Sequence, residues 1–268
     1  RFPIDLYECE DCSCVQTLDC IDPEFLWSGY TYFSGQTEGI VQHQNEFAIN
    51  TIEKFSIGKD DTVLDIGSND GTLLEAFKKN GCEVVGIDPA ETVASVANQR
   101  GIFTHVGLFS DQELLKLPTD LRQNFATVVT AFNVFAHSDD MQGMIRGVRQ
   151  ALTKEGLFFF EVQYLRDILE KRLLGTIFHE HMIHYSITSA SNFLQRNGFR
   201  LVSLQRNNIQ KGSIIFCAAK EESSWDTESI VDELKVEEQA AGILDGSRFS
   251  EFAAFIKKSQ KDVQKLLK

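Results

Sequence analysis

From about residue 62 onward, short continuous apolar runs alternate with stretches in which apolar residues recur every three or four positions. Continuous runs predict buried strands, and the helical spacing predicts amphipathic helices that cover them. Strands are expected at 62–66, 83–87, 103–106, 126–132 and 156–162, and helices at 72–79, 92–100, 141–152 and 189–196. Apolar strands separated by helices indicate βαβ units and a parallel sheet.

The segments on either side of this pattern complete the predicted fold. Residues 1 to about 40 are expected to be irregular, and a helix follows through Phe47 and Phe55. Segments 200–205 and 213–219 could pair antiparallel at the far edge of the sheet, and the chain is helical and charged from residue 224. The predicted fold class is α/β, with a doubly wound, mostly parallel seven-stranded sheet, a small irregular N-terminal module and a C-terminal helical segment.

Composition narrows the possible partners. The 268 residues carry a net charge of −13, which disfavours the broad phosphate contacts of a nucleic-acid-binding protein. No run approaches the roughly 18 apolar residues of a membrane helix, and the first residues lack the apolar core of a signal peptide. We therefore expect a cytoplasmic protein with no nucleic-acid or membrane partner, and the sequence gives no indication of the oligomeric state.

The most informative segment is Val63-Leu-Asp-Ile-Gly-Ser-Asn-Asp-Gly-Thr-Leu73. Here a predicted strand ends at Ile66, turns through Gly67 and Gly71, and enters a helix. Ligands of open parallel sheets bind beyond the carboxyl ends of the strands, where glycine allows the backbone to approach them closely. This loop is therefore the predicted cofactor site.

The charge of the loop indicates which cofactor it binds. A dinucleotide-binding loop has Gly-x-Gly-x-x-Gly, whereas residue 69 is Asn and residues 65 and 70 are Asp. An acidic loop suits a ligand with an amino group and a sulfonium. Asp88, at the end of the next strand, could accept hydrogen bonds from ribose hydroxyls. The pattern resembles the class I S-adenosylmethionine (SAM)-dependent methyltransferases with their Rossmann-like fold, and the predicted cofactor-binding residues are Asp65, Gly67, Asn69, Gly71, Asp88 and Asn133.

Four histidines fall near the same edge of the predicted sheet, and three interpretations of them remain open. They are His137, His179, His181 and His184. The zincin pattern His-Glu-x-x-His fails because residue 183 is Ile. A three-histidine metal site, structural histidines, and general acid–base catalysis with Glu180 orienting a histidine are all compatible with the sequence.

Several segments resemble the nucleotide-sugar C-methyltransferases, which act on keto intermediates of deoxysugars. They are Phe2-Pro-Ile-Asp-Leu-Tyr-Glu-Cys-Glu-Asp-Cys12, Tyr30-Thr-Tyr-Phe-Ser34, Asn133-Val-Phe-Ala-His137 and His179-Glu-His181 followed by Tyr185-Ser. The resemblance implies catalytic roles for Tyr32, His137, Glu180 and His181. Two departures concern the substrate side: Phe178 stands where the family usually has Tyr, and Gln210-Lys-Gly-Ser213 replaces a His-Gly-Gly-Ser turn.

The same resemblance implies the domain organisation. Residues 1–45 would be part of a zinc-ribbon-like module, 46–221 the SAM-dependent methyltransferase domain, and 222–268 a helical segment that leads to a further domain. The four cysteines in the first twenty residues fit a metal site better than a disulfide framework. Cys9 and Cys12 match half of the family's structural zinc site. The chain is therefore expected to be truncated at both ends.

The predicted reaction is methylation of a carbon next to a ketone on a nucleotide-linked sugar, through an enolate. We expect His181, assisted by Glu180, to be the base, with His137 as the alternative base and Tyr32 bonded to the keto oxygen. Two other functions remain possible. The protein could methylate an oxygen or nitrogen of another small metabolite, or it could be a non-catalytic SAM-binding fragment.

Overall fold

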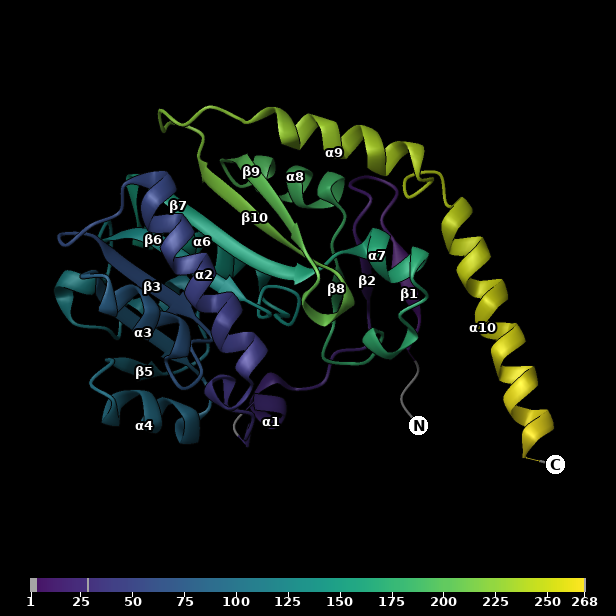
Figure 1. Cartoon of the computed structure of the whole chain (residues 1–268), viewed down its shortest axis with the longest axis horizontal. Helices are drawn as coiled ribbons and strands as arrows, with labels where there is room; N and C mark the ends of the chain where they lie inside the picture. Colours follow the sequence, from purple (N-terminus) through teal and green to yellow (C-terminus); the bar gives the residue numbers. More distant parts are fainter. Residues whose placement is uncertain (1–3, 28, 268) are drawn as a thin grey trace.

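The computed structural model describes residues 4–27 and 29–267, whose largest element is a seven-stranded sheet with the order β5-β4-β3-β6-β7-β10-β9 (Figure 1). Its strands are β3 (Thr62–Ile66), β4 (Glu83–Asp88), β5 (Thr104–Val106), β6 (Ala126–Phe132), β7 (Leu152–Gln163), β9 (Phe199–Asn207) and β10 (Ser213–Lys220). Strands β3 to β7 run parallel, and β10 is antiparallel to both β7 and β9. The predicted fold class is confirmed, including the antiparallel pair at the edge.

Helices cover both faces of this sheet. They are α2 (Glu38–Phe55), α3 (Thr72–Lys79), α4 (Glu91–Gln99), α5 (Asp111–Leu114), α6 (Met141–Ala151) and α8 (Ile187–Arg196). Helix α7 (Leu165–Glu170) packs instead in a separate small cluster. Buried residues of α2 and α3 form one core cluster with one face of the sheet, whereas α6 and α8 contribute to the cluster on the other face. The expected helices are present, and α6 ends one residue early because β7 begins at Leu152.

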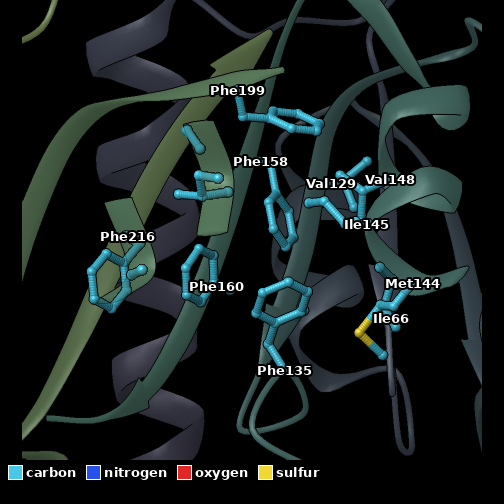
Figure 2. Packing of buried hydrophobic residues seen from close by; sticks show 14 of the residues in the cluster. Ile66, Val129, Phe135, Met144, Ile145, Val148, Phe158, Phe160, Phe199 and Phe216 are labelled. Carbon is cyan, nitrogen blue, oxygen red and sulfur yellow. The ribbon is translucent and has the colours of Figure 1, made fainter. Parts of the chain in front are cut away.

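The aromatic side chains of β7 pack against both faces at the centre of the sheet. Successive strand residues point to opposite faces, so Phe158 and Phe160 lie on one face and Phe159 on the other. The rings of Phe160 and Phe216 stack with centroids 4.6 Å apart. Figure 2 shows these rings beside Phe135, with side chains of α6 facing them. This packing fixes the carboxyl ends of β6 and β7, where the predicted histidine site begins.

The N-terminal segment is more ordered than the sequence indicated. Strands β1 (Leu6–Glu8) and β2 (Val15–Thr17) pair antiparallel, and β2 also pairs with β8 (Ile183–His184). A short helix, α1 (Pro23–Trp27), follows. The expectation of an irregular segment is wrong here, because strands of two or three residues leave little hydrophobic pattern. Phe2 and Pro3, which belong to the first motif, lie outside the described residues.

The two C-terminal helices contact the sheet domain differently. Helix α9 (Ser229–Ala240) packs beside α8 and β9, whereas α10 (Ser247–Leu266) extends away from the body (Figure 1). Near its start, α10 inserts Phe252 into a small cluster with side chains of α7 and β2. Across residues 4–27 and 29–267, no helix combines the length and the apolar character needed to cross a membrane.

A buried carboxylate holds α9 against the first turn of α8. The Glu238 side chain, with no exposed surface, accepts hydrogen bonds from the main-chain N–H groups of Ile187 and Thr188 at 2.7 and 3.0 Å. It also accepts from the Thr188 hydroxyl at 2.8 Å and the Tyr164 hydroxyl at 3.0 Å. An anion at a helix N-terminus satisfies N–H groups that have no partner inside the helix.

We therefore expect Glu238→Gln to lower the free energy of unfolding by about 1.5–3 kcal/mol, because the charged acceptor of four hydrogen bonds is lost. The neighbouring Glu237→Gln removes only an exposed ion pair with Arg166 and should change stability by less than about 1 kcal/mol. Urea unfolding of the two variants compares them directly. Equal effects would contradict the role given to Glu238.

Candidate active site

The loop after β3 has a backbone that only glycine adopts easily at two positions. Gly67 and Gly71 have φ values of +67° and +78°. A Cβ atom on Gly67 would lie 2.3 Å from Cγ2 of Val134, and one on Gly71 would lie 2.8 Å from Cδ1 of Ile102. Both glycines are therefore required by the turn and by the close packing around it.

Two buried carboxyl groups flank this loop. Asp65 accepts a hydrogen bond from the Thr130 hydroxyl at 2.6 Å, and burial raises the pKa of Asp65 to about 7. Asp88 accepts from the main-chain N–H groups of Asn69 and Ala90, both at 2.8 Å, and burial raises its pKa. A nearby cation would favour the ionised form of both groups. The loop therefore fits a positively charged ligand.

Asn69 has a different partner from the one that the sequence suggested. Its amide nitrogen donates to the carbonyl oxygen of Tyr32 at 2.9 Å, and its amide oxygen accepts from the main-chain N–H of Ser34 at 2.9 Å. Asp70 accepts from the N–H of Gly35 at 3.0 Å. Side chains of the loop thus hold residues 32–35 across it, and any contact of Asn69 with a ligand would involve its backbone.

Glu180 does not make the contact with His181 that was expected of it, and the Tyr32 hydroxyl has a partner within the protein. The Tyr32 hydroxyl donates to Thr37 Oγ1 at 3.0 Å, and 45% of the Tyr32 surface is exposed. The carboxylate of Glu180 was predicted to orient His181. It lies instead near Tyr30, whose pKa is raised mainly by burial of the Tyr30 side chain and to a smaller extent by the charge of Glu180. Glu180 does not orient His181 because main-chain carbonyl groups lie at the positions beside the imidazoles that the carboxylate was expected to occupy.

His137 and His181 are fixed in the same way. The Nδ1 atom of His137 lies 2.7 Å from the carbonyl oxygen of Glu180, and that of His181 lies 2.6 Å from the carbonyl oxygen of Thr176. A carbonyl oxygen only accepts, so each Nδ1 carries the proton, and the neutral ring of His181 has an unprotonated Nε2. His137 makes a second hydrogen bond with the backbone of Asn133. Burial lowers the pKa of His137 to about 4 and also lowers that of His181. Both rings are therefore neutral at pH 7 and able to accept a proton.

The two rings share a small cavity at the ends of β6 and β7. Their centroids are 4.9 Å apart. The cavity has a volume of about 10 Å³ and is lined by Asn133, Ala136, His137, Val162, Gln163, His181, Ile183 and His184. Asn133, with φ +56°, follows β6 and donates its N–H to the carbonyl oxygen of Glu161. Of the predicted residues, the structure brings Asn133, His137 and His181 together.

A buried hydrogen-bonded group beside this site was missed by the sequence analysis. Glu161, 1% exposed, contacts His43 Nε2 at 2.9 and 3.0 Å and accepts a hydrogen bond from Asn207 at 2.6 Å. The presence of a carboxylate inside an apolar strand could have indicated a buried polar group. Its partners come from α2 and β9, however, and no local pattern connects them to β7.

The predicted zinc ligands form only a pair within the part of the chain that the structure describes. A hydrogen bond between their side chains joins Cys9 and Cys12, and the pKa of Cys9 is lowered mainly by a hydrogen bond from the backbone of Asp11. Residues 4–27 and 29–267 contain no group of three or more His, Cys, Asp or Glu side chains arranged to hold a metal ion. Two thiols do not supply the four ligands of a structural zinc site.

Comparison with known proteins agrees with the geometry of the loop. A family model described as a methyltransferase domain matches residues 41–204. The chain is 32% identical over 267 residues to the C-methyltransferase NovU of Streptomyces niveus, covering 100% of this chain and 63% of that protein. It is 31% identical over 102 residues to a ubiquinone biosynthesis O-methyltransferase of Histophilus somni, covering 37% of this chain and 43% of that protein. The chain thus spans less than two thirds of these relatives.

Solved structures share the fold at low sequence identity. Magnesium protoporphyrin IX methyltransferase from Synechocystis, solved with bound SAH, matches with a TM-score of 0.53 at 16% identity, covering 72% of this chain and 89% of that chain. A complex of the Trm112 methyltransferase activator and a methyltransferase of Haloferax volcanii matches with a TM-score of 0.56 at 14% identity, covering 75% of this chain and 99% of that chain. These matches support the fold.

We expect Gly67→Ala to lower the free energy of unfolding by more than about 1 kcal/mol, because a left-handed residue gains a Cβ atom against Val134. The displaced loop should also bind SAM more weakly. Gly58→Ala is the matched control, since no atom lies within 4 Å of the position of its added Cβ atom. Chemical unfolding and calorimetric titration with SAM measure both effects, and a Gly67→Ala protein that matches Gly58→Ala would refute the account.

The buried histidines also predict a pH dependence of stability. Burial lowers the pKa of His184 to about 4, whereas histidine in the unfolded chain has a pKa of about 6.5. At pH values below about 6.5 the folded protein therefore binds fewer protons than the unfolded chain. This contribution to stability is complete above about 6.5 and is lost as the pH falls toward 4.

Between pH 7 and 5, wild-type protein should therefore lose stability relative to His184→Phe, by up to about 1.4 kcal/mol per pH unit. The raised pKa of Asp65 acts in the opposite direction, but it is common to both proteins and cancels in their difference. Urea unfolding at several pH values measures this difference. Parallel pH curves would show that His184 does not titrate in this way.

Proposed function

The chain belongs to the SAM-dependent methyltransferases, and we propose that it methylates a carbon atom next to the ketone of a nucleotide-linked deoxysugar, through an enolate. The observation that carries the proposal is the pair of neutral imidazoles in the cavity at the ends of β6 and β7, each with Nδ1 bonded to a carbonyl oxygen. Carbon methylation needs a base that acts at neutral pH, and this pair would supply one.

The loop after β3 would hold the methyl donor. Gly67 and Gly71 let the backbone approach it, and the carboxyl groups of Asp65 and Asp88 provide negative charge and acceptors for ribose hydroxyls. Asn133, directly after β6, would lie by its methionine end. When bound, SAM supplies an electrophilic methyl group on a positively charged sulfur.

His181 is the proposed base. Its Nε2 would take the proton from the carbon next to the ketone, while its Nδ1–H continues to donate to the carbonyl oxygen of Thr176. That hydrogen bond strengthens as the ring becomes positively charged, which stabilises the imidazolium. His137 also has its Nδ1 at a carbonyl oxygen, with a second hydrogen bond to the backbone of Asn133, and is the alternative base. The remaining task of the protein is to align the substrate carbon.

Two further observations support this substrate class. The C-methyltransferase NovU is similar over the whole length of this chain. The motifs around Tyr32, His137 and His181 resemble those of the nucleotide-sugar C-methyltransferases. Phe178 and the turn 210–213 depart from that pattern, so the sugar recognised here is expected to differ from those of relatives that have Tyr and His there.

The test is exchange of the substrate C–H proton with solvent. Wild-type protein, incubated in D2O with S-adenosylhomocysteine and a nucleotide-linked keto-deoxysugar, should introduce deuterium next to the ketone. His181→Asn should slow this exchange by about 10²–10⁴-fold, because the base is lost. NMR or mass spectrometry of the sugar measures the rate.

His105→Asn is the matched control, since His105 lies in the edge strand β5 and bonds to Glu113. It should exchange at the wild-type rate. Methylation of an oxygen or nitrogen by wild-type protein without carbon exchange would replace the proposed function with the other methyltransferase candidate. Normal exchange by His181→Asn would refute only the identity of the base.

A further inference from the structure

The cavity beside His181 contains two buried polar atoms that lack partners among the described residues. They are Oε1 of Gln163 and Nε2 of His184, and both side chains line the cavity. His184 is only 3% exposed, so water cannot satisfy it from outside. Burying polar atoms without hydrogen bonds is unfavourable, which indicates that a polar group occupies this recess when the protein functions.

The size and the position of the recess limit what that group can be. A volume of about 10 Å³ admits a single oxygen atom, such as one water molecule. His137 and His181 line the same cavity, and the rings of His181 and His184 are 6.4 Å apart. An oxygen in the recess would therefore lie next to the carbon from which His181 takes a proton.

Both side chains are held by strands. Gln163 is the last residue of β7 and pairs with Ser213 of β10, while His184 in β8 pairs with Val15 of β2. Groups on paired strands need little reorganisation during a reaction, and fixed dipoles are the most effective in stabilising developing charge. The N-terminal sheet thus contributes directly to the geometry of the recess.

The two groups can both donate hydrogen bonds to an oxygen. Burial lowers the pKa of His184 to about 4, so its ring is neutral, and in the tautomer with the proton on Nε2 it donates into the recess. A half-turn of the Gln163 amide about its last bond presents the NH2 group to the cavity in place of the oxygen. The Tyr32 hydroxyl, by contrast, already donates to Thr37. His184 and Gln163 would therefore act on the keto oxygen whether or not Tyr32 also reaches it.

We propose that His184 and Gln163 form the oxyanion hole for the enolate. As the substrate proton moves to Nε2 of His181, the C–H electron pair forms the new C=C bond and the carbonyl π pair moves onto oxygen. That oxygen, now negatively charged, accepts hydrogen bonds from Nε2–H of His184 and from the amide of Gln163. The proposal rests on the proposed function, because only a reaction through an enolate develops this charge.

The arrangement favours the enolate over the ketone. A ketone oxygen is a weaker acceptor than an enolate oxygen, so the same two donors stabilise the charged state more. The effect should therefore fall on the rate of proton abstraction and only slightly on KM.

The test uses the exchange assay in D2O with S-adenosylhomocysteine and a nucleotide-linked keto-deoxysugar, which needs no methyl transfer. His184→Phe should slow exchange by about 10²–10³-fold at nearly unchanged KM. Gln163→Leu should slow it in the same direction. His184→Gln, which restores an N–H donor, should recover part of the loss. Gln150→Leu, at the other end of the sheet, is the matched control and should exchange normally.

The outcomes separate this proposal from the function on which it rests. If wild-type protein exchanges the proton and His181→Asn does not, but His184→Phe and Gln163→Leu both exchange normally, the recess holds only a water molecule and the oxyanion hole is refuted. If wild-type protein exchanges no proton, the enolate itself is refuted and the oxyanion hole with it. Calorimetric binding of S-adenosylhomocysteine by each variant verifies that the variant is folded. Comparing His184→Phe, which has no donor, with His184→Gln, which has one, separates loss of the donor from loss of packing.

Discussion

The Nδ1–H groups of His137 and His181 donate to main-chain carbonyl oxygens, and these two hydrogen bonds determine how the rings are oriented and protonated. A side-chain partner could rotate away or change its charge with pH, whereas a carbonyl oxygen is fixed and always an acceptor. The tautomer of each ring is therefore set by the backbone. A carboxylate in the same place would raise the pKa of the ring, and the ring would then be protonated over a wider pH range.

The carbonyl oxygens are in place because distant parts of the chain meet at the ends of β6 and β7. His137 follows β6, while Glu180 and His181 precede β8. Strand β8 is held by β2, and the N–H groups of Met182 and Ile183 donate to the carbonyl oxygen of Ala136. The large sheet fixes one side of the pocket through its aromatic core, and the small sheet fixes the other. The N-terminal segment is thus a structural part of the site.

The sequence predicted what depends on local signals. Strand β3, the turn with Gly67 and Gly71, and helix α3 are each encoded within a few residues, and their bounds were predicted correctly. The pairing of β2 with β8 was not predicted, because two very short strands far apart in sequence carry no periodic pattern. The hydrogen-bond partner predicted for His181 differs from the observed one for a related reason. Glu180 is adjacent in sequence, but neighbouring side chains need not face each other, and the Thr176 carbonyl took that position.

One physical cause, burial, shifts the acids and the bases of the pocket in opposite directions. It raises the pKa values of Asp65 and Asp88 and lowers those of His137, His181 and His184. Without a ligand, both kinds of group therefore tend toward their neutral forms. A cation at the loop after β3 would lower all of these pKa values, because it favours carboxylates and disfavours imidazolium. Binding a sulfonium would favour the ionised form of the acids that hold it, whereas the imidazoles are already neutral at pH 7 and would stay neutral. The charge of the cofactor would therefore change the protonation of the loop and leave that of the proposed bases as it is.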